Sequence, residues 1–199
     1  MLFRSILCQD TKLNISPAYL KPGFAFGGSC LPKDLRALTY QAKLLDLNSP
    51  VLNAILLSNS YQKELVINTI LGFGKKRVGF VGMSFKPDTD DLRESPLVDV
   101  IETLLGKGYR VKIFDKNISI SRLIGANKSH MDEHLPHLSC LLVDTVEALI
   151  DNSDVIVVGH KQPEFIAKMN TLKCDQVVID LVRSPKTAAV RARYDGIAW

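Results

Sequence analysis

The sequence has 199 residues, of which 46% are hydrophobic and 23% are charged, and its formal net charge is +4. This composition excludes a disordered chain, a collagen-like repeat and a membrane-embedded protein. The charged residues are scattered without a basic block, so we expect no nucleic-acid partner. Residues 1–8 lack the pattern of a signal peptide, and we expect a cytoplasmic protein with no membrane partner.

The first third of the chain predicts a loop and two helices. Glycine, proline, serine and asparagine crowd residues 13–30, which favours a loop. Pro32 suits a first helical turn, and apolar residues recur at helical spacing from there to Leu45. A second periodic segment begins at Pro50 and ends at Gly72. We interpret this second helix as a connector between two parts of the chain.

The remainder of the chain alternates short apolar segments with helical patterns. The predicted strands are 78–81, 111–114, 155–158 and 177–181. The predicted helices between them are 96–106, 146–150 and 165–169. Such alternation is typical of a parallel sheet covered by helices. The fold class is therefore α/β, with a helical part over 1–74 followed by a Rossmann-like domain over 75–199.

Cys30 is the candidate nucleophile. Four cysteines without a close pair predict neither a disulfide framework nor a zinc knuckle, so each is judged as a free thiol. The glycines at 27 and 28 allow close approach of a ligand, and a helix is expected to begin just after Cys30. That helix terminus and Lys33 both favour the thiolate, and both could stabilise an oxyanion. The alternative is a small buried cysteine in a turn.

A second polar loop follows the first predicted strand. Ligands bind outside the carboxyl ends of parallel strands, which is where residues 82–95 are expected. Lys86 and Arg93 are the only cations of this loop, and they could neutralise phosphate oxygens or pair with neighbouring carboxylates. The loop lacks the third glycine of a dinucleotide fingerprint. We therefore do not expect NAD to bind this sheet in the usual Rossmann manner, although Asp115 ends the second strand.

One sequence pattern resembles a zinc-binding motif, and we interpret the resemblance as accidental. His130 to His134 spell HxxEH, and His137 adds a third imidazole. Pro136 interrupts the segment before a helix could place both histidines rigidly on one face. We expect no metal site.

Two motifs resemble those of the UDP-glucose/GDP-mannose dehydrogenase family. Residues 27–34, GGSCLPKD, are similar to its catalytic-cysteine motif, and Lys86 followed seven residues later by Arg93 is similar to its second signature. The sequence of residues 14–28 is most similar to that of the GDP-mannose branch of the family. The resemblance implies oxidation of the C6 hydroxyl of GDP-mannose with two NAD⁺, through a cysteine thiohemiacetal and thioester, to GDP-mannuronate for alginate-type polysaccharide.

The resemblance also implies roles for individual residues. Cys30 is the nucleophile, and Asp34 assists in acid-base steps or positions the hydrolytic water. The residues implied to contact NAD are Lys33 and Arg93. The residues implied to surround the sugar nucleotide are Tyr19, Lys21, Phe24, Gly27 and Lys86. The family has arginine where this chain has Lys21 and a second tyrosine where it has Ala18, which puts two substrate contacts in doubt.

The resemblance covers only the later half of the family's pattern. A glycine-rich segment that binds NAD⁺ is not found among the 199 residues, so we expect the chain by itself to turn over very slowly or not at all. In the full-length enzyme the resemblance implies a homodimer formed through the central domain. The alternatives are a non-catalytic nucleotide-sugar binding module and a fragment of a UDP-glucose 6-dehydrogenase. Guanine and uracil are not distinguished by the sequence.

Overall fold

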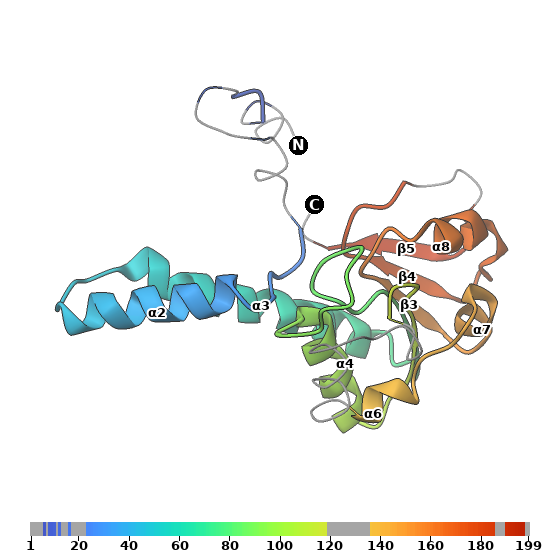
Figure 1. The fold of residues 1–199 in the computed structure, drawn as a ribbon. Coiled ribbons are helices and arrows are strands. Elements are labelled where there is room, and N and C mark those ends of the chain that lie inside the picture. Colours follow the sequence, from blue (N-terminus) through green and yellow to red (C-terminus); the bar gives the residue numbers. More distant parts are fainter. Residues whose placement is uncertain are drawn as a thin grey trace.

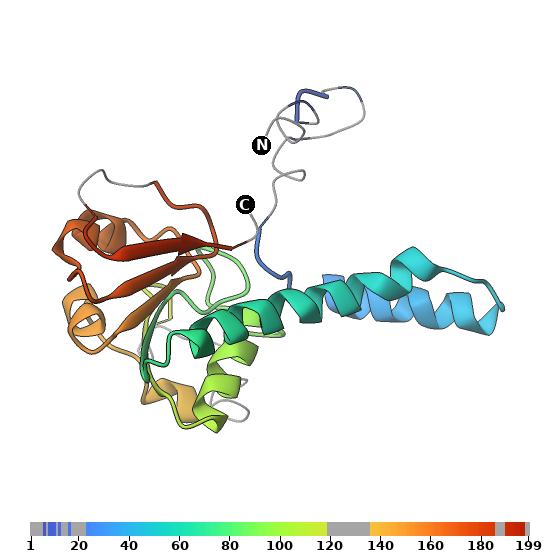
Figure 2. The same cartoon turned by 180° about the vertical axis from the view of Figure 1, so that it is seen from behind.

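A computed structural model describes residues 6, 8–10, 12, 16, 23–118, 136–185 and 190–197. Two long helices come first in this part of the chain: α2 (Leu31–Leu44) and α3 (Pro50–Gly72). Each has a proline in its first turn, as the sequence predicts. Helix α2 runs away from the rest of the molecule and α3 returns beside it, so the pair projects as a helical hairpin (Figure 1; Figure 2). No described helix has the length and apolar character needed to span a bilayer.

The hairpin is anchored at one end only. Val66 and Ile70, near the end of α3, are completely buried and pack in the core of the α/β domain. In α2 only Pro32 and Leu35 are buried. Large apolar side chains farther along the hairpin are more than half exposed, among them Leu38, Leu44, Leu45, Leu47, Val51 and Leu57. The predicted division between residues 74 and 75 stays a prediction, because α3 itself belongs partly to the α/β core.

The sheet has five parallel strands in the order β2-β1-β3-β4-β5. Their bounds are β1 Arg77–Val81, β2 Arg110–Phe114, β3 Val155–Val158, β4 Val177–Asp180 and β5 Arg193–Gly196. The four predicted strands and the α/β fold class are confirmed. Strand β5 was not predicted, because its four residues, RYDG, lack the apolar run of a buried strand and lie only partly covered at the sheet edge.

Helices cover both faces of the sheet (Figure 1). They are α4 (Pro96–Gly106), α6 (Pro136–Ser139), α7 (Val146–Asp151) and α8 (Pro163–Lys168), the last followed by a 3₁₀ turn over Met169–Thr171. Successive strand residues point to opposite faces, so Val155 joins a core with Ile70 and Ile101, whereas Ile156 joins a second core with Phe165. This two-sided burial explains why the strands consist of uninterrupted apolar residues.

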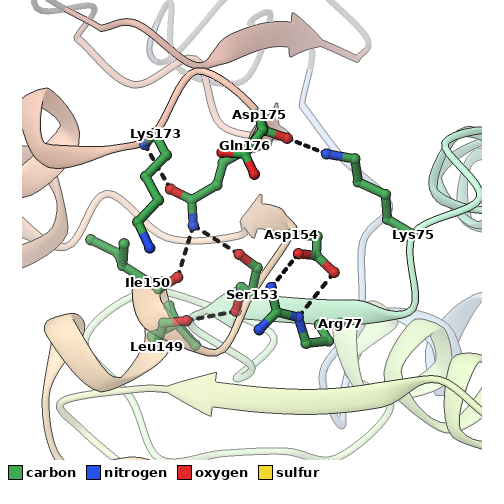
Figure 3. Close-up of polar contacts among 9 residues, drawn as sticks. All are labelled: Lys75, Arg77, Leu149, Ile150, Ser153, Asp154, Lys173, Asp175 and Gln176. Carbon is green, nitrogen blue, oxygen red and sulfur yellow. Dashed lines mark hydrogen bonds and ion pairs between the residues drawn. The ribbon is translucent and has the colours of Figure 1, made fainter.

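The amino-terminal edge of the sheet is held by a polar network that is buried at Gln176 and Ser153 and exposed at Arg77 (Figure 3). Gln176 donates from Nε2 to the carbonyls of Ile150 and Ser153, at 2.8 Å each. Arg77 donates to both carboxylate oxygens of Asp154, at 3.1 and 2.5 Å. These contacts connect the start of β1 to the turns before β3 and β4. They lie at the edge opposite the carboxyl ends of the strands and leave those ends available for a site.

Candidate active site

Cys30 occupies the N-cap position of α2 and is exposed. Its carbonyl accepts the first helical hydrogen bond from the N–H of Asp34, at 2.8 Å, while its side chain caps nothing. Ser29 Oγ lies 3.7 Å from the sulfur. The first-turn N–H groups of a helix have no acceptor within the helix, so the thiol stands at a positive dipole end. The exposure excludes the buried-cysteine alternative.

The loop before Cys30 is held by α3. The N–H of Phe26 donates to Asn59 Oδ1 at 2.8 Å, and Asn59 Nδ2 donates back to the Phe26 carbonyl at 2.9 Å. Phe24 packs against the core of the α/β domain. The loop is therefore fixed between the helical hairpin and the sheet, although its own residues form neither helix nor strand.

The two sequence motifs meet in the folded chain. A Cβ atom at Gly27 would lie 2.1 Å from the carbonyl oxygen of Glu94, and one at Gly28 would lie 2.7 Å from the ring of Phe85. Gly28 also has a φ of +91°, which side chains other than glycine rarely adopt. Arg36 adds two hydrogen bonds to the carboxylate of Glu94, at 2.9 and 2.6 Å. The cysteine loop thus packs directly on residues 85–94.

Arg93 faces this junction. Its guanidinium donates to both oxygens of Asp91, at 2.8 and 2.7 Å. These hydrogen bonds raise the pKa of Arg93 above its ordinary value, and the charges of Asp91 and Cys30 raise it further. The cation therefore lies within electrostatic range of Cys30. Of the two alternatives that the sequence left open, the structure shows the pairing of Arg93 with a loop carboxylate, and its contact with a ligand stays a prediction.

The other two predicted cations, Lys33 and Lys86, differ in their contacts. Lys33 pairs with Asp34 at 3.5 Å, and both side chains are about two-thirds exposed, at 66% and 67%. The backbone of Lys86 is fixed because its carbonyl accepts from Ser84 Oγ and Thr89 Oγ1, at 2.7 and 2.9 Å. Within the described residues no carboxylate lies within 4.0 Å of the Lys86 ammonium. The exposed ammonium of Lys86 can therefore donate hydrogen bonds to a phosphate group of a ligand.

A cleft of about 560 Å³ opens beside Lys86 at the carboxyl edge of the sheet. Its walls come from the segments that follow β1, β2, β3 and β4. They are Pro87, Asp88, Lys116, Asn117, His160, Lys161, Gln162, Pro163, Glu164 and Val182. From β1 the chain adds β2 on one side of the sheet and β3 with the later strands on the other side. The cleft lies at the carboxyl ends of these strands, where ligands bind to parallel sheets at such a reversal of strand order.

A buried polar cluster supports the floor of the cleft. Asp115 accepts the N–H of Met83 at 2.8 Å, so it anchors the β1 loop and is not free to bind a ribose. His160 Nε2 lies 3.0 Å from the Ser84 carbonyl, and burial lowers its pKa below the ordinary value. Its ring stands 2.4 Å from where a Cβ of Gly82 would be. His160 thus fills the space through which a pyrophosphate would approach this turn, and the sheet does not fit a dinucleotide in the usual place.

Several predicted residues lie outside the described part of the chain. They are Tyr19, Lys21, Ala18 and the HxxEH segment 130–134. His137 is described and its Nε2 lies 3.1 Å from Glu102 Oε1. The described residues contain no group of three side chains suited to hold a metal ion.

Four residues of the site were missed by sequence reasoning: Arg36, Asn59, His160 and Gln162. Arg36 and Asn59 are polar residues on helices and give no local signal, since their partners lie 58 and 33 residues away. His160 and Gln162 come directly after β3. That position, at the carboxyl end of a buried strand, is a signal that could have identified them.

Comparisons with known proteins agree with this geometry. Residues 79–185 match the model of the UDP-glucose/GDP-mannose dehydrogenase family, UDP binding domain, and residues 4–61 match that family's central domain. The chain is 46% identical to GDP-mannose 6-dehydrogenase of Pseudomonas aeruginosa over 98% of its length. It is 31% identical to UDP-glucose 6-dehydrogenase of Rickettsia bellii over 90% of its length.

Solved structures of dehydrogenases are also similar to this chain. A ternary complex of GDP-mannose dehydrogenase from Pseudomonas aeruginosa has a TM-score of 0.83 at 43% identity, covering all of this chain and 45% of that one. A UDP-glucose dehydrogenase from Pyrobaculum islandicum has a TM-score of 0.77 at 28% identity, covering 100% and 43%. The chain spans 44% of the length of the Pseudomonas aeruginosa relative and 42% of the Rickettsia bellii one. The chain belongs to the UDP-glucose/GDP-mannose dehydrogenase family.

Proposed function

We propose that this chain forms the catalytic-cysteine and sugar-nucleotide part of an NAD-dependent GDP-mannose 6-dehydrogenase. One observation carries the proposal: the loop of Cys30 packs directly on the loop of Arg93 and Lys86. An exposed thiol, an arginine within electrostatic range of it, and a lysine with no carboxylate partner among the described residues therefore stand on two loops in contact. Two GDP-mannose 6-dehydrogenases that are 46% identical to this chain support the choice of substrate.

In the proposed chemistry the C6 hydroxyl first loses a hydride from carbon and a proton from oxygen, which gives the C6 aldehyde. The Cys30 thiolate then adds to the aldehyde carbon, so a C–S bond forms and the carbonyl becomes an alkoxide that takes a proton. The N–H groups of Leu31 and Lys33, in the first turn of α2, are the donors that would stabilise this oxyanion. Loss of a hydride from C6 and of the proton from the hydroxyl group gives a thioester. Water attacks that carbonyl, the C–S bond breaks, and carboxylate and thiolate are released, with Asp34 placed to position the water.

NAD⁺, when bound, accepts the hydride in each oxidation. The sheet of this chain does not fit the dinucleotide, because His160 fills the space beside Gly82. We therefore assign NAD binding to a polypeptide segment other than these 199 residues. The exposed cations beside the thiol, Lys33 and Arg93, are the groups with which this chain would contact the cofactor.

The substrate is proposed to lie along the carboxyl edge of the sheet. Lys86 would hold the diphosphate, with the sugar extending toward Cys30 past Phe24 and Gly27. Tyr19 and Lys21 complete the proposed sugar contacts. The proposal includes a homodimer in the complete enzyme, with Lys21 serving the neighbouring subunit, and a product used for alginate-type polysaccharide.

The test combines this chain with the part of a relative that the chain does not match. The segment of the Pseudomonas aeruginosa enzyme that this chain does not match is added, and NADH formation from GDP-mannose is followed by absorbance. We expect turnover that Cys30→Ser abolishes and that Cys174→Ser, at another exposed cysteine, leaves unchanged. Turnover that persists in Cys30→Ser would refute the cysteine mechanism.

A binding measurement separates the second candidate, a non-catalytic nucleotide-sugar module, which the lysine at position 21 in place of the family's arginine favours. Calorimetry with GDP-mannose on the full chain should give saturable binding that Lys86→Met weakens by about 10- to 100-fold, because a charged hydrogen bond is lost. Lys107→Met, at an exposed lysine after α4, is the control. Binding with no turnover in the combined assay would support the module.

A further inference from the structure

We propose that Arg36 is a positioning residue that holds the Arg93 loop against the helix carrying Cys30. The inference rests on the proposed function, in which the thiol and the Arg93 cation act at one centre. Arg36 belongs to α2, whose N-cap is Cys30, and Glu94 directly follows Arg93 in the chain. The contact between Arg36 and Glu94 therefore joins the element that carries the thiol to the loop that carries the cation.

The Arg36 contact fixes an orientation as well as a distance. Its Nη1 donates to Glu94 Oε2 at 2.9 Å, and its Nη2 donates to Oε1 at 2.6 Å. A planar guanidinium that donates to both oxygens of a carboxylate restricts the rotation of both groups. The same hydrogen bonds raise the pKa of Arg36 and lower the pKa of Glu94, so both side chains are charged at neutral pH.

The pair is too exposed to act mainly by stabilising the fold. The side chains of Arg36 and Glu94 are 51% and 44% exposed. Ion pairs with this exposure contribute little to the free energy of unfolding, because water and salt screen the charges. What the pair determines is the position of one segment relative to another, since its partners lie 58 residues apart in the sequence.

The backbone at Glu94 needs contacts from outside its own loop. Its φ is +47°, in the left-handed region that residues other than glycine rarely adopt. A residue in this region keeps its conformation only where the surrounding structure holds it. Residues 27–36 supply two such contacts, because Arg36 binds the carboxylate and Gly27 lies against the carbonyl oxygen. The left-handed turn comes directly after Arg93, so its conformation determines where that side chain is placed.

The consequence concerns the separation between Arg93 and the sulfur. Arg93 lies within electrostatic range of Cys30, and its guanidinium is paired with Asp91 of its own loop. That pairing orients Arg93 within the loop but makes no connection to α2. Arg36 is the charged side chain of α2 that supplies one, so we infer that the cation stays near the thiol only while Arg36 is in place.

The test compares the rates at which iodoacetate and iodoacetamide alkylate Cys30 in the full chain, with each modified position followed by mass spectrometry. Both reagents react with the same thiolate, so the ratio of their rates cancels the exposure and ionisation of the thiol and reports the charge near the sulfur. Arg93→Met sets the reference. We expect it to lower the ratio about two- to fivefold at low ionic strength, which is the effect of one nearby unit charge in water.

Arg36→Met and Glu94→Met should each lower the ratio at Cys30 toward the Arg93→Met value. The double variant of Arg36 and Glu94 should lower it no further than either single variant, because each change breaks the same contact. The sign of the Glu94→Met effect separates positioning from simple charge. Loss of a negative charge near the thiol would by itself raise the ratio, whereas release of the Arg93 loop lowers it.

Lys63→Met is the matched control. Lys63 pairs with Asp99 at 2.5 Å and also joins the helical hairpin to the α/β domain, but its partner lies on α4 and not on the Arg93 loop. We expect this variant to keep the ratio at Cys30. The exposed Cys174 is a second control within the same chain, and its ratio should be the same in every variant.

A ratio that rises or stays unchanged in Glu94→Met would overturn the inference. An unchanged ratio in Arg93→Met, or an equal fall in Lys63→Met and Arg36→Met, would overturn it as well. In each case the proposed function stands, because the alkylation assay uses neither substrate nor cofactor. Absence of both turnover in the combined assay and GDP-mannose binding would overturn the proposed function without changing these ratios.

Discussion

Gly27→Ala tests whether the cysteine loop is held against the Arg93 loop. The added Cβ would lie 2.1 Å from the Glu94 carbonyl oxygen and 2.8 Å from Pro96 Cδ, whereas ordinary contact begins at 3.4 Å. The two backbones would have to separate by about 1.3 Å, the difference between 3.4 and 2.1 Å. Overpacking of this kind costs about 1–3 kcal/mol, which raises the population of the open loop by about 5- to 150-fold.

Hydrogen exchange of the Phe26 amide measures this opening directly, because that N–H is bonded to Asn59 Oδ1 only while the loop is in place. We expect its exchange to accelerate by the same factor in Gly27→Ala. Gly23→Ala is the matched control, since a Cβ there meets no atom within 4 Å. Unchanged exchange in Gly27→Ala, or equal acceleration in both variants, would show that the two loops do not touch as described.

Two further predictions concern the amino-terminal edge of the sheet. The hydrogen bond from Arg77 lowers the pKa of Asp154 below its ordinary 3.8, so the pair stabilises the fold above about pH 4 and this contribution is lost as the pH falls through the lowered value. Arg77→Met should reduce the free energy of unfolding in urea at pH 7, and reduce it by progressively less below pH 4; a loss that grows on acidification would contradict this. Gln176→Leu removes the donor to the buried Ser153 carbonyl and the acceptor of the Lys173 N–H, and should cost about 2 kcal/mol or more, whereas the exposed Gln41→Leu should change stability by less than about 0.5 kcal/mol. Equal effects of the two leucine substitutions would refute the buried network.

The helices and buried strands could be predicted because their signals are local. A proline in the first turn identified α2, α3 and α4, and uninterrupted apolar segments identified β1 to β4. Strand β5 was missed because an edge strand needs little apolar surface. The motif residues Cys30, Lys86 and Arg93 were likewise recognisable in the sequence, although their roles stay predictions.

The sequence by itself determined the fold class, the family and the residues of the two motifs, because periodicity and short motifs depend only on neighbours along the chain. The tertiary structure alone decided that Gly27 and Glu94 touch, that Arg93 lies within electrostatic range of Cys30, and that His160 fills the space beside Gly82. These properties depend on contacts between residues far apart in the sequence, and local spacing does not determine them.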